Sequence, residues 1–153
     1  MSNAELCPCG SGNLYHECCG PYHEGTPAPT AEALMRARYS AYVLNNNKFL
    51  LNTWHPGSRP ESISLLNTNH LNWTGLEILR SEMGDIKDKM GIVEFKAHYQ
   101  SDNGRGYLHE VSNFVKEENH WLYFDGEIEI KSDEEQDDFK DFKPVRRRMS
   151  MEP

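Results

Sequence analysis

The residue types best suited to chemistry in this chain are its four cysteines, which all lie near the N-terminus as Cys7, Cys9, Cys18 and Cys19. They form a Cys-x-Cys pair and a Cys-Cys pair separated by eight residues. Thiolates are soft ligands, and four that converge suit a tetrahedral zinc ion, although they suit iron as well. Pro8 stiffens the first pair, and Gly10 and Gly12 let the backbone turn tightly behind it. The spacing therefore predicts a small metal knuckle, with zinc as the expected ion and iron as the alternative.

Other uses of these residues stay open at this point. His16 and His23 could each replace a cysteine as a ligand, but four cysteines already complete a tetrahedron, so we expect both histidines at the surface. Disulfides would need an oxidising compartment, and the sequence shows no secretory segment. Adjacent Cys18 and Cys19 are also badly placed to pair with each other. A zinc ion held by four thiolates has no open position for water, so we expect a structural site rather than a catalytic one.

The composition limits the classes of partner. With 153 residues, the chain has room for one ordinary domain and a small appendage. Its net charge of -8 argues against a general affinity for nucleic acid or for anionic lipid. No apolar run approaches the ~20 residues of a membrane span. Because no signal peptide is evident, we expect a cytoplasmic protein that does not bind membranes.

Helices are expected to follow the knuckle after a linker. Residues 20–29 are rich in glycine and proline, which predicts an extended and fairly stiff connection. Thr30 is a suitable N-cap for a first helix. One apolar stripe recurs along that helix at helical spacing, formed by Met35, Tyr39, Tyr42 and Val43. A second short helix is predicted over residues 48–54 and a third over residues 60–69.

Strands are expected in the second half of the chain, over residues 76–80, 91–100, 106–116 and 121–130. Turn residues separate them, and Asn103-Gly104 is a strong hairpin signal. In the second predicted strand, Val93, Phe95, Ala97 and Tyr99 share one face, and Glu94, Lys96, His98 and Gln100 share the other. Helices followed by an antiparallel sheet predict an α+β fold. The remainder, from residue 132 to residue 153, reads as a charged tail.

A pocket between helix and sheet is the second place where chemistry could occur. Glu110 alternates in register with Leu108 and Phe114, so we expect it to point inward. A buried carboxylate must be paired or protonated, and the structural alternative is a salt bridge to Arg36 or Arg38. The candidate pocket residues are Glu110, Arg36, Arg38, His98 and Tyr39. We expect the tryptophans to belong to the core.

The cysteine string also carries a resemblance. Cys-Pro-Cys-Gly-Ser-Gly-x-x-Tyr-x-x-Cys-Cys resembles the SEC-C motif, the small metal-binding knuckle that ends the preprotein translocase ATPase SecA. Three further stretches, residues 35–42, 53–56 and 121–126, resemble the YchJ-like family of bacterial proteins. This resemblance implies a SEC-C knuckle over residues 5–25 and a cone-shaped α+β domain of the nuclear transport factor 2-like type over residues 30–131. The family has no established activity.

The resemblance also implies a role for the knuckle. SEC-C knuckles are docking modules, associated with a protein-export chaperone and with the ribosome. Related motifs often carry lysines between the cysteine pairs, whereas this chain has Asn13, His16 and Glu17 there, with Glu5 and Glu24 nearby. Because phosphate binding depends on lysine and arginine, we expect a protein partner with some basic surface rather than RNA. Many YchJ-like proteins have a second knuckle near the C-terminus, and this chain has no cysteine after Cys19.

The sequence therefore predicts a metal-binding adaptor that docks a protein partner, in protein export, as a chaperone adaptor or at the ribosome. The alternative is a small-molecule-binding or enzymatic cone with a pocket acid at Glu110. No nucleophile–base motif or phosphate loop is evident, which favours the adaptor over the enzyme. Domains of this cone type often pair through the outer face of the sheet, and a homodimer through that face is a further expectation.

Overall fold

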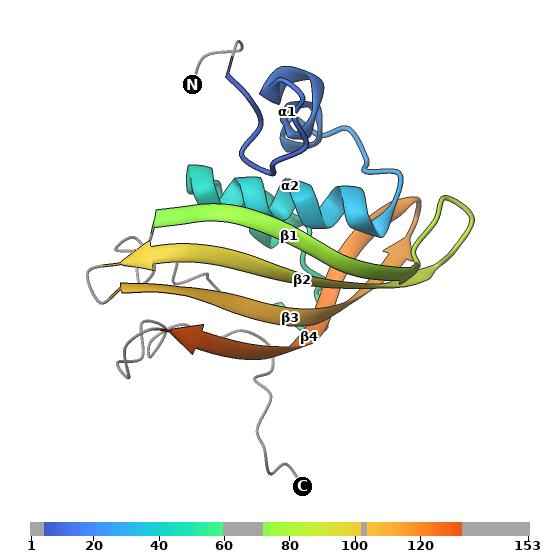
Figure 1. Ribbon diagram of the computed structural model, residues 1–153. Coiled ribbons are helices and arrows are strands. Elements are labelled where there is room, and N and C mark those ends of the chain that lie inside the picture. The colour runs from blue at the N-terminus through green and yellow to red at the C-terminus, as the bar shows by residue number, and fades with distance from the viewer. Residues whose placement is uncertain (1–4, 60–71, 102–103, 133–153) are drawn as a thin grey trace, which may run out of the picture.

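The computed structural model describes residues 5–59, 72–101 and 104–132. A short 3-10 turn (Tyr15–Glu17) is followed by helices α1 (Cys19–His23), α2 (Ala31–Leu44) and α3 (Asn47–Asn52), and by strands β1 (Asn72–Met83), β2 (Met90–Ser101), β3 (Gly104–Glu117) and β4 (His120–Ser132). The strands form one antiparallel sheet in the order β1-β2-β3-β4 (Figure 1). The predicted α+β class is confirmed. The third predicted helix, the Asn103 side of the hairpin signal and the charged tail beyond residue 132 lie outside the described residues.

Local sequence sets the limits of α2 and α3. The Thr30 side chain accepts a hydrogen bond from the Ala33 amide at 3.1 Å, as expected of an N-cap. Asn45 ends α2 in the left-handed conformation, with a φ of 60°. Asn46 then caps α3 by accepting from the Phe49 amide. This cap starts α3 one residue before its predicted range, and the helix ends at Asn52 instead of continuing through Trp54.

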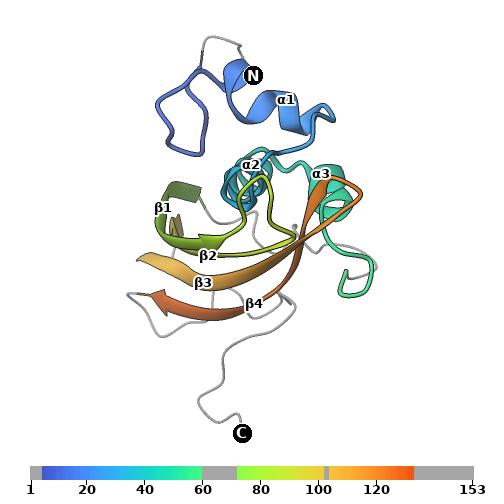
Figure 2. The ribbon, with the colours of Figure 1, turned by 90° about the vertical axis from the view of Figure 1, so that its right-hand side faces the viewer.

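Three layers build the molecule, as Figure 2 shows. The N-terminal segment with α1 lies on one side of α2, and the sheet lies on the other (Figure 2). The sheet turns an apolar face toward α2, formed on β2 by Val93, Phe95, Ala97 and Tyr99, which are all buried. The alternation predicted for this strand is therefore confirmed. On β3 the inward side chains are Leu108, Glu110, Ser112 and Phe114.

The base of the β1–β2 hairpin fixes the start of α2. The Ala31 amide donates to the Gly84 carbonyl at 3.0 Å. Gly84 has a φ of 76°, and a Cβ on the facing Gly91 would lie 2.6 Å from the Gly84 Cα and 3.1 Å from the Ala31 Cβ. Two glycines are therefore required where the hairpin and the helix approach each other closely. At the same end of the sheet, β3 and β4 join through a two-residue turn in which Glu118 and Asn119 both have positive φ.

The segment predicted as an extended linker contains α1 instead. Residues Cys19–His23 are helical, and only the residues that follow lead as loop to Thr30. Pro21 is tolerated because it lies in the first turn, where its missing amide hydrogen has no helical partner. Among the described helices, none is long and apolar enough to cross a membrane.

Candidate functional site

The four cysteines converge at one point. The Sγ atoms of Cys7, Cys9, Cys18 and Cys19 all lie within 4.8 Å of one another, and Cys9 Sγ is 3.6 Å from Cys18 Sγ. Tetrahedral zinc with bonds of about 2.3 Å needs sulfur–sulfur separations of about 3.8 Å, so the four donors fit such an ion. Cys7, Cys9 and Cys19 are buried, and Cys18 is partly exposed. The cluster can therefore hold a metal ion that is largely shielded from solvent.

Tight backbone turns bring the first pair of cysteines into place. Gly10 and Gly12 have φ values of 82° and 90°, a conformation that residues with a Cβ rarely adopt. The Cys7 amide donates to the Asn13 carbonyl at 2.9 Å, which closes the loop between the two cysteine pairs. Leu6 and Leu14 form an isolated antiparallel bridge at the base of this loop. The glycines predicted to permit the turn thus adopt the conformations that require glycine.

Side chains outside the cluster hold the sulfurs in position. Ser11 Oγ lies 3.2 Å from Cys18 Sγ, and Ser40 Oγ of α2 lies 3.5 Å from Cys7 Sγ. Arg36 of α2 donates to the Cys9 carbonyl at 3.2 Å, and its guanidinium reaches to 4.0 Å from the Cys9 sulfur. Such groups orient metal ligands and offset part of the thiolate charge. Helix α2 therefore supplies part of the surroundings of the cysteines. The contact from Ser40 was not predicted from the sequence.

The cysteines cannot all be ionised without a cation. Hydrogen bonding with Cys7 and Cys9 raises the pKa of Cys19, and the same bond from Cys19 lowers the pKa of Cys7. Burial raises the pKa of Cys18. Like charges so close together oppose one another, so the sulfurs share protons until a metal ion displaces them. An ion bound by all four thiolates would have no open coordination position, which is the arrangement of a structural rather than a catalytic site.

His23 joins the knuckle to the larger domain. Its Nε2 lies 2.8 Å from the Ala37 carbonyl oxygen of α2, and its Nδ1 lies 2.6 Å from the Tyr15 hydroxyl. A carbonyl only accepts, so Nε2 carries the hydrogen and Nδ1 accepts from Tyr15. Burial lowers the pKa of His23, which favours this neutral form. The prediction of a surface histidine is wrong for His23, which is half-buried and packs against the ring of Phe49, whereas His16 is exposed.

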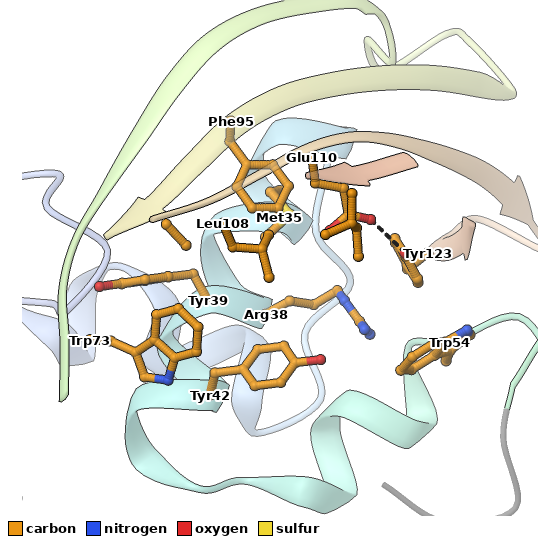
Figure 3. Close-up of a pocket in the computed structure, with 12 residues that line it drawn as sticks. Met35, Arg38, Tyr39, Tyr42, Trp54, Trp73, Phe95, Leu108, Glu110 and Tyr123 are labelled. Carbon is orange, nitrogen blue, oxygen red and sulfur yellow. Dashed lines mark hydrogen bonds between the residues drawn. The ribbon is translucent and has the colours of Figure 1, made fainter. Parts of the chain in front are cut away.

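A second candidate site is a cavity between α2 and the sheet (Figure 3). Its volume is about 50 Å³, so side chains fill most of the space. Most of its lining is aromatic or aliphatic: Met35, Tyr39, Tyr42, Trp54, Trp73, Phe95, Ala97, Leu108, Tyr123 and Ile128. Arg38 and Glu110 are the charged residues that the described chain contributes to it. Two of the tryptophans expected in the core thus line the cavity as well.

Glu110 and Arg38 face this cavity without forming an ion pair. Glu110 Oε2 accepts a hydrogen bond from the Tyr123 hydroxyl at 2.6 Å (Figure 3). Arg38 donates through Nη1 to the Leu50 carbonyl at 2.9 Å and to Thr53 Oγ1 at 2.8 Å. The structural alternative of a Glu110–arginine salt bridge is therefore wrong, because the partner of Glu110 is a tyrosine of β4. Arg38 instead donates hydrogen bonds to oxygen atoms of α3 and of the residue that caps the C-terminus of α3.

Two predicted pocket residues lie elsewhere. Arg36 faces the knuckle, because residues two apart on a helix project about 200° from each other and Arg38 already faces the sheet. His98 lies on the outer face of the sheet, where its Nε2 is 3.2 Å from Glu77. His98 alternates with the inward residues of β2, so the two-residue period of the strand places its side chain on the face away from the pocket. Of the predicted pocket residues, the structure brings together Glu110, Arg38 and Tyr39.

Replacing Glu110 with glutamine should change how stability depends on pH. Burial raises the pKa of Glu110 above its ordinary value of 4.5, so the folded state holds this proton more tightly than the unfolded state. Wild-type protein should therefore lose stability relative to Glu110→Gln as the pH rises from 4.5 through the raised pKa, by up to about 1.4 kcal/mol per pH unit. Denaturant unfolding of both proteins at several pH values measures this difference. A constant difference between them would contradict the assignment.

Comparison with known proteins places both parts of the chain. The family model described as YchJ, middle NTF2-like domain, matches residues 30–126, and the SEC-C motif matches residues 4–21. A UPF0225 protein from Chromobacterium violaceum is 46% identical over 123 residues, covering 78% of this chain and 90% of the relative. A UPF0225 protein from Streptomyces coelicolor is 47% identical over 123 residues, covering 80% and 94%.

Solved structures resemble this one over most of its length. The solution structure of a SEC-C motif containing protein from Rhodopseudomonas palustris has a TM-score of 0.70 at 33% identity, covering 78% of this chain and 95% of that one. A crystal structure of a SEC-C motif containing protein from Psychrobacter arcticus also has a TM-score of 0.70, at 31% identity, covering 80% and 82%. With a SEC-C motif ahead of an NTF2-like domain, the chain belongs to the YchJ-like family of UPF0225 proteins.

Proposed function

We propose that this protein is a cytoplasmic adaptor whose zinc-loaded knuckle docks a protein partner. The observation that carries the proposal is the closed cluster of four cysteine sulfurs, which offers no coordination position to a substrate. A closed metal site instead stabilises a small surface. Here the Tyr15–His23–Ala37 hydrogen bonds also fix that surface on α2, so its groups are preorganised for binding.

The exposed side chains of the knuckle indicate the chemistry of the partner. Glu5, Glu17 and Glu24 are all exposed, and Leu6 is 63% exposed beside them. An acidic rim around an apolar contact is complementary to a basic protein surface with an apolar centre. Because the motif resembles that of the translocase ATPase, export chaperones and ribosomal proteins are the first partners to test.

The enzymatic alternative has less support. An acid–base reaction usually needs two titratable groups that act in turn. The described lining of the cavity contributes one carboxyl and no imidazole, and the Tyr123 hydroxyl already binds that carboxyl. Burial raises the pKa of the lining tyrosines, which keeps them neutral. The cavity of about 50 Å³ also leaves little room for a substrate.

A pull-down from bacterial lysate tests the adaptor proposal. Metal-loaded wild type should enrich a specific partner, and chelator-stripped protein should not. The double variant Glu5→Lys/Glu17→Lys should reduce that enrichment at least about fivefold, because it reverses the charge of the binding surface. Elemental analysis of the purified protein identifies the bound metal.

The matched control is Glu127→Lys/Glu129→Lys, which makes the same change of charge on exposed positions of β4. This strand belongs to the sheet, on the opposite side of α2 from the knuckle (Figure 2). Equal enrichment with and without metal, or an equal loss of binding in the β4 control, would refute docking through the knuckle.

A further inference from the structure

A buried guanidinium faces the cavity between α2 and the sheet without an ion-pair partner in the part of the chain that the structure describes. Arg38 is only 3% exposed, and its hydrogen bonds go to neutral oxygens, those of Leu50, Thr53 and the Tyr42 hydroxyl. The rings of Trp54 and Tyr123 lie 5.1 Å and 4.7 Å from its central carbon. Within the described ranges, no carboxylate forms an ion pair with it. A buried cation that has only neutral partners is costly, so this environment favours the arrival of an anion.

Glu110 is poorly placed to act as that anion. Its carboxyl is committed to Tyr123, and burial raises its pKa, which favours the neutral acid. A neutral carboxylic acid can donate its own hydrogen bond, so it adds a donor to the cavity rather than a negative charge. Glu110 and Arg38 attract each other across the cavity, but no ion pair between them balances the buried charge of Arg38.

Donors remain available at this end of the cavity. Both hydrogen bonds that Arg38 makes to the α3 region leave from Nη1, and Arg38 also bonds the Tyr42 hydroxyl. A guanidinium has five N–H groups, so it can still donate to a further acceptor, and a hydroxyl that accepts from it can donate its own hydrogen. Figure 3 shows the Tyr42 hydroxyl beside the guanidinium, on the side away from the Glu110–Tyr123 pair. A guanidinium flanked by a hydroxyl suits the two oxygens of a carboxylate.

The rest of the cavity suits a short apolar group. Met35, Phe95 and Leu108 form its wall between the helix and β2 and β3 (Figure 3). Tyr42 and Trp73 are the lining residues that remain partly exposed, so the entrance from solvent lies at these two side chains. A volume of about 50 Å³ admits only a few heavy atoms.

We propose that this cavity binds a short-chain carboxylate, with its carboxylate against Arg38 and Tyr42 and its alkyl end against Phe95 and Leu108. The site is independent of docking through the knuckle, because it lies on the opposite side of α2.

Titration of the metal-loaded full-length protein with propionate tests the proposal. Trp54 and Trp73 line the cavity, so their fluorescence reports occupancy. At constant ionic strength, propionate should give a saturable change in fluorescence. Propionamide, which has the same shape without the charge, should bind at least about tenfold more weakly, because it loses the charge-assisted hydrogen bonds.

Two variants assign the binding to the cavity without replacing Arg38, which also supports α3. Tyr42→Phe should weaken propionate binding about fivefold through the loss of one donor, and Ala97→Leu should abolish it by filling the space. Tyr107→Phe is the matched control, because Tyr107 lies on the outer face of the sheet beside Lys96, and it should bind propionate as wild type does.

Three results would overturn the proposal. Absence of propionate binding would show that an ionised Glu110 already balances Arg38 and excludes a second anion. Equal affinity for propionamide would show that the negative charge of the carboxylate does not contribute to binding. Unchanged binding in both cavity variants would place the carboxylate elsewhere on the protein.

Discussion

Replacing Cys19 with serine is expected to release the metal ion and to destabilise the whole chain by about 4 kcal/mol or more. Cys19 is 1% exposed and lies where α1 begins, so its sulfur is both a candidate ligand and part of the packing against α2. A serine hydroxyl does not replace a thiolate as a soft ligand. Because the knuckle packs on α2, its loss should expose the helix that supports the sheet. Metal content by elemental analysis and denaturant unfolding measure the two effects.

His16→Ala is the control for this experiment. His16 is exposed on the knuckle, and four sulfurs already converge without it. The His16 variant should therefore keep one equivalent of metal and nearly all of the wild-type stability. A full equivalent of metal in Cys19→Ser would show that Cys19 is not an essential ligand, and loss of metal in His16→Ala would show that the ligand set includes this histidine.

Placing a methyl group on Gly126 should destabilise the protein by about 3 kcal/mol, because β4 has no room for it. A Cβ at this position would overlap Oε2 of Glu110 and lie 2.9 Å from its Cδ. Glu110 cannot simply swing away, because it is buried and its carboxyl holds the Tyr123 hydroxyl. The free energy of unfolding of Gly126→Ala, measured in denaturant, tests this expectation.

The second half of the test is a double-mutant cycle. In a Glu110→Ala background the same Gly126→Ala change should cost less than about 1 kcal/mol, since the carboxyl that it meets is gone. Gly75→Ala on β1 is the matched control, because a Cβ there meets nothing within 4 Å. If Gly126→Ala costs the same in both backgrounds, the loss arises from the strand backbone and not from Glu110.

The parts of the fold that follow from local patterns could be predicted from the sequence. The alternation along β2 and β3 has a period of two residues, so it placed Phe95 and Glu110 on the inward face. Thr30 supplied a cap whose geometry depends only on its neighbours. The cysteine spacing predicted that the four sulfurs converge, because soft ligands of one type are rarely gathered for another purpose.

Contacts between distant segments could not be predicted in this way. Nothing local distinguishes a histidine that is exposed, such as His16, from one that joins two parts of the protein, such as His23. The partner of Glu110 depends on the register of β3 against β4, which brought Tyr123 to it instead of an arginine. The positions of Arg36 and His98 could have been predicted from the helix and strand periods, because these periods place both side chains away from the pocket.

The position of α2 between the knuckle and the sheet restricts which substitutions this helix can accept during evolution. Its buried residues occur on both sides, with Ala37 and Ser40 toward the cysteine cluster and Met35 and Tyr39 toward the sheet. An ordinary surface helix has a solvent face on which sequence can drift with little effect on stability. Here a larger side chain at Ala37 or Ser40 would separate the knuckle from the domain, while a smaller one at Tyr39 would open the core. Sequence drift in this protein is therefore left mainly to the outer face of the sheet and to the exposed loops.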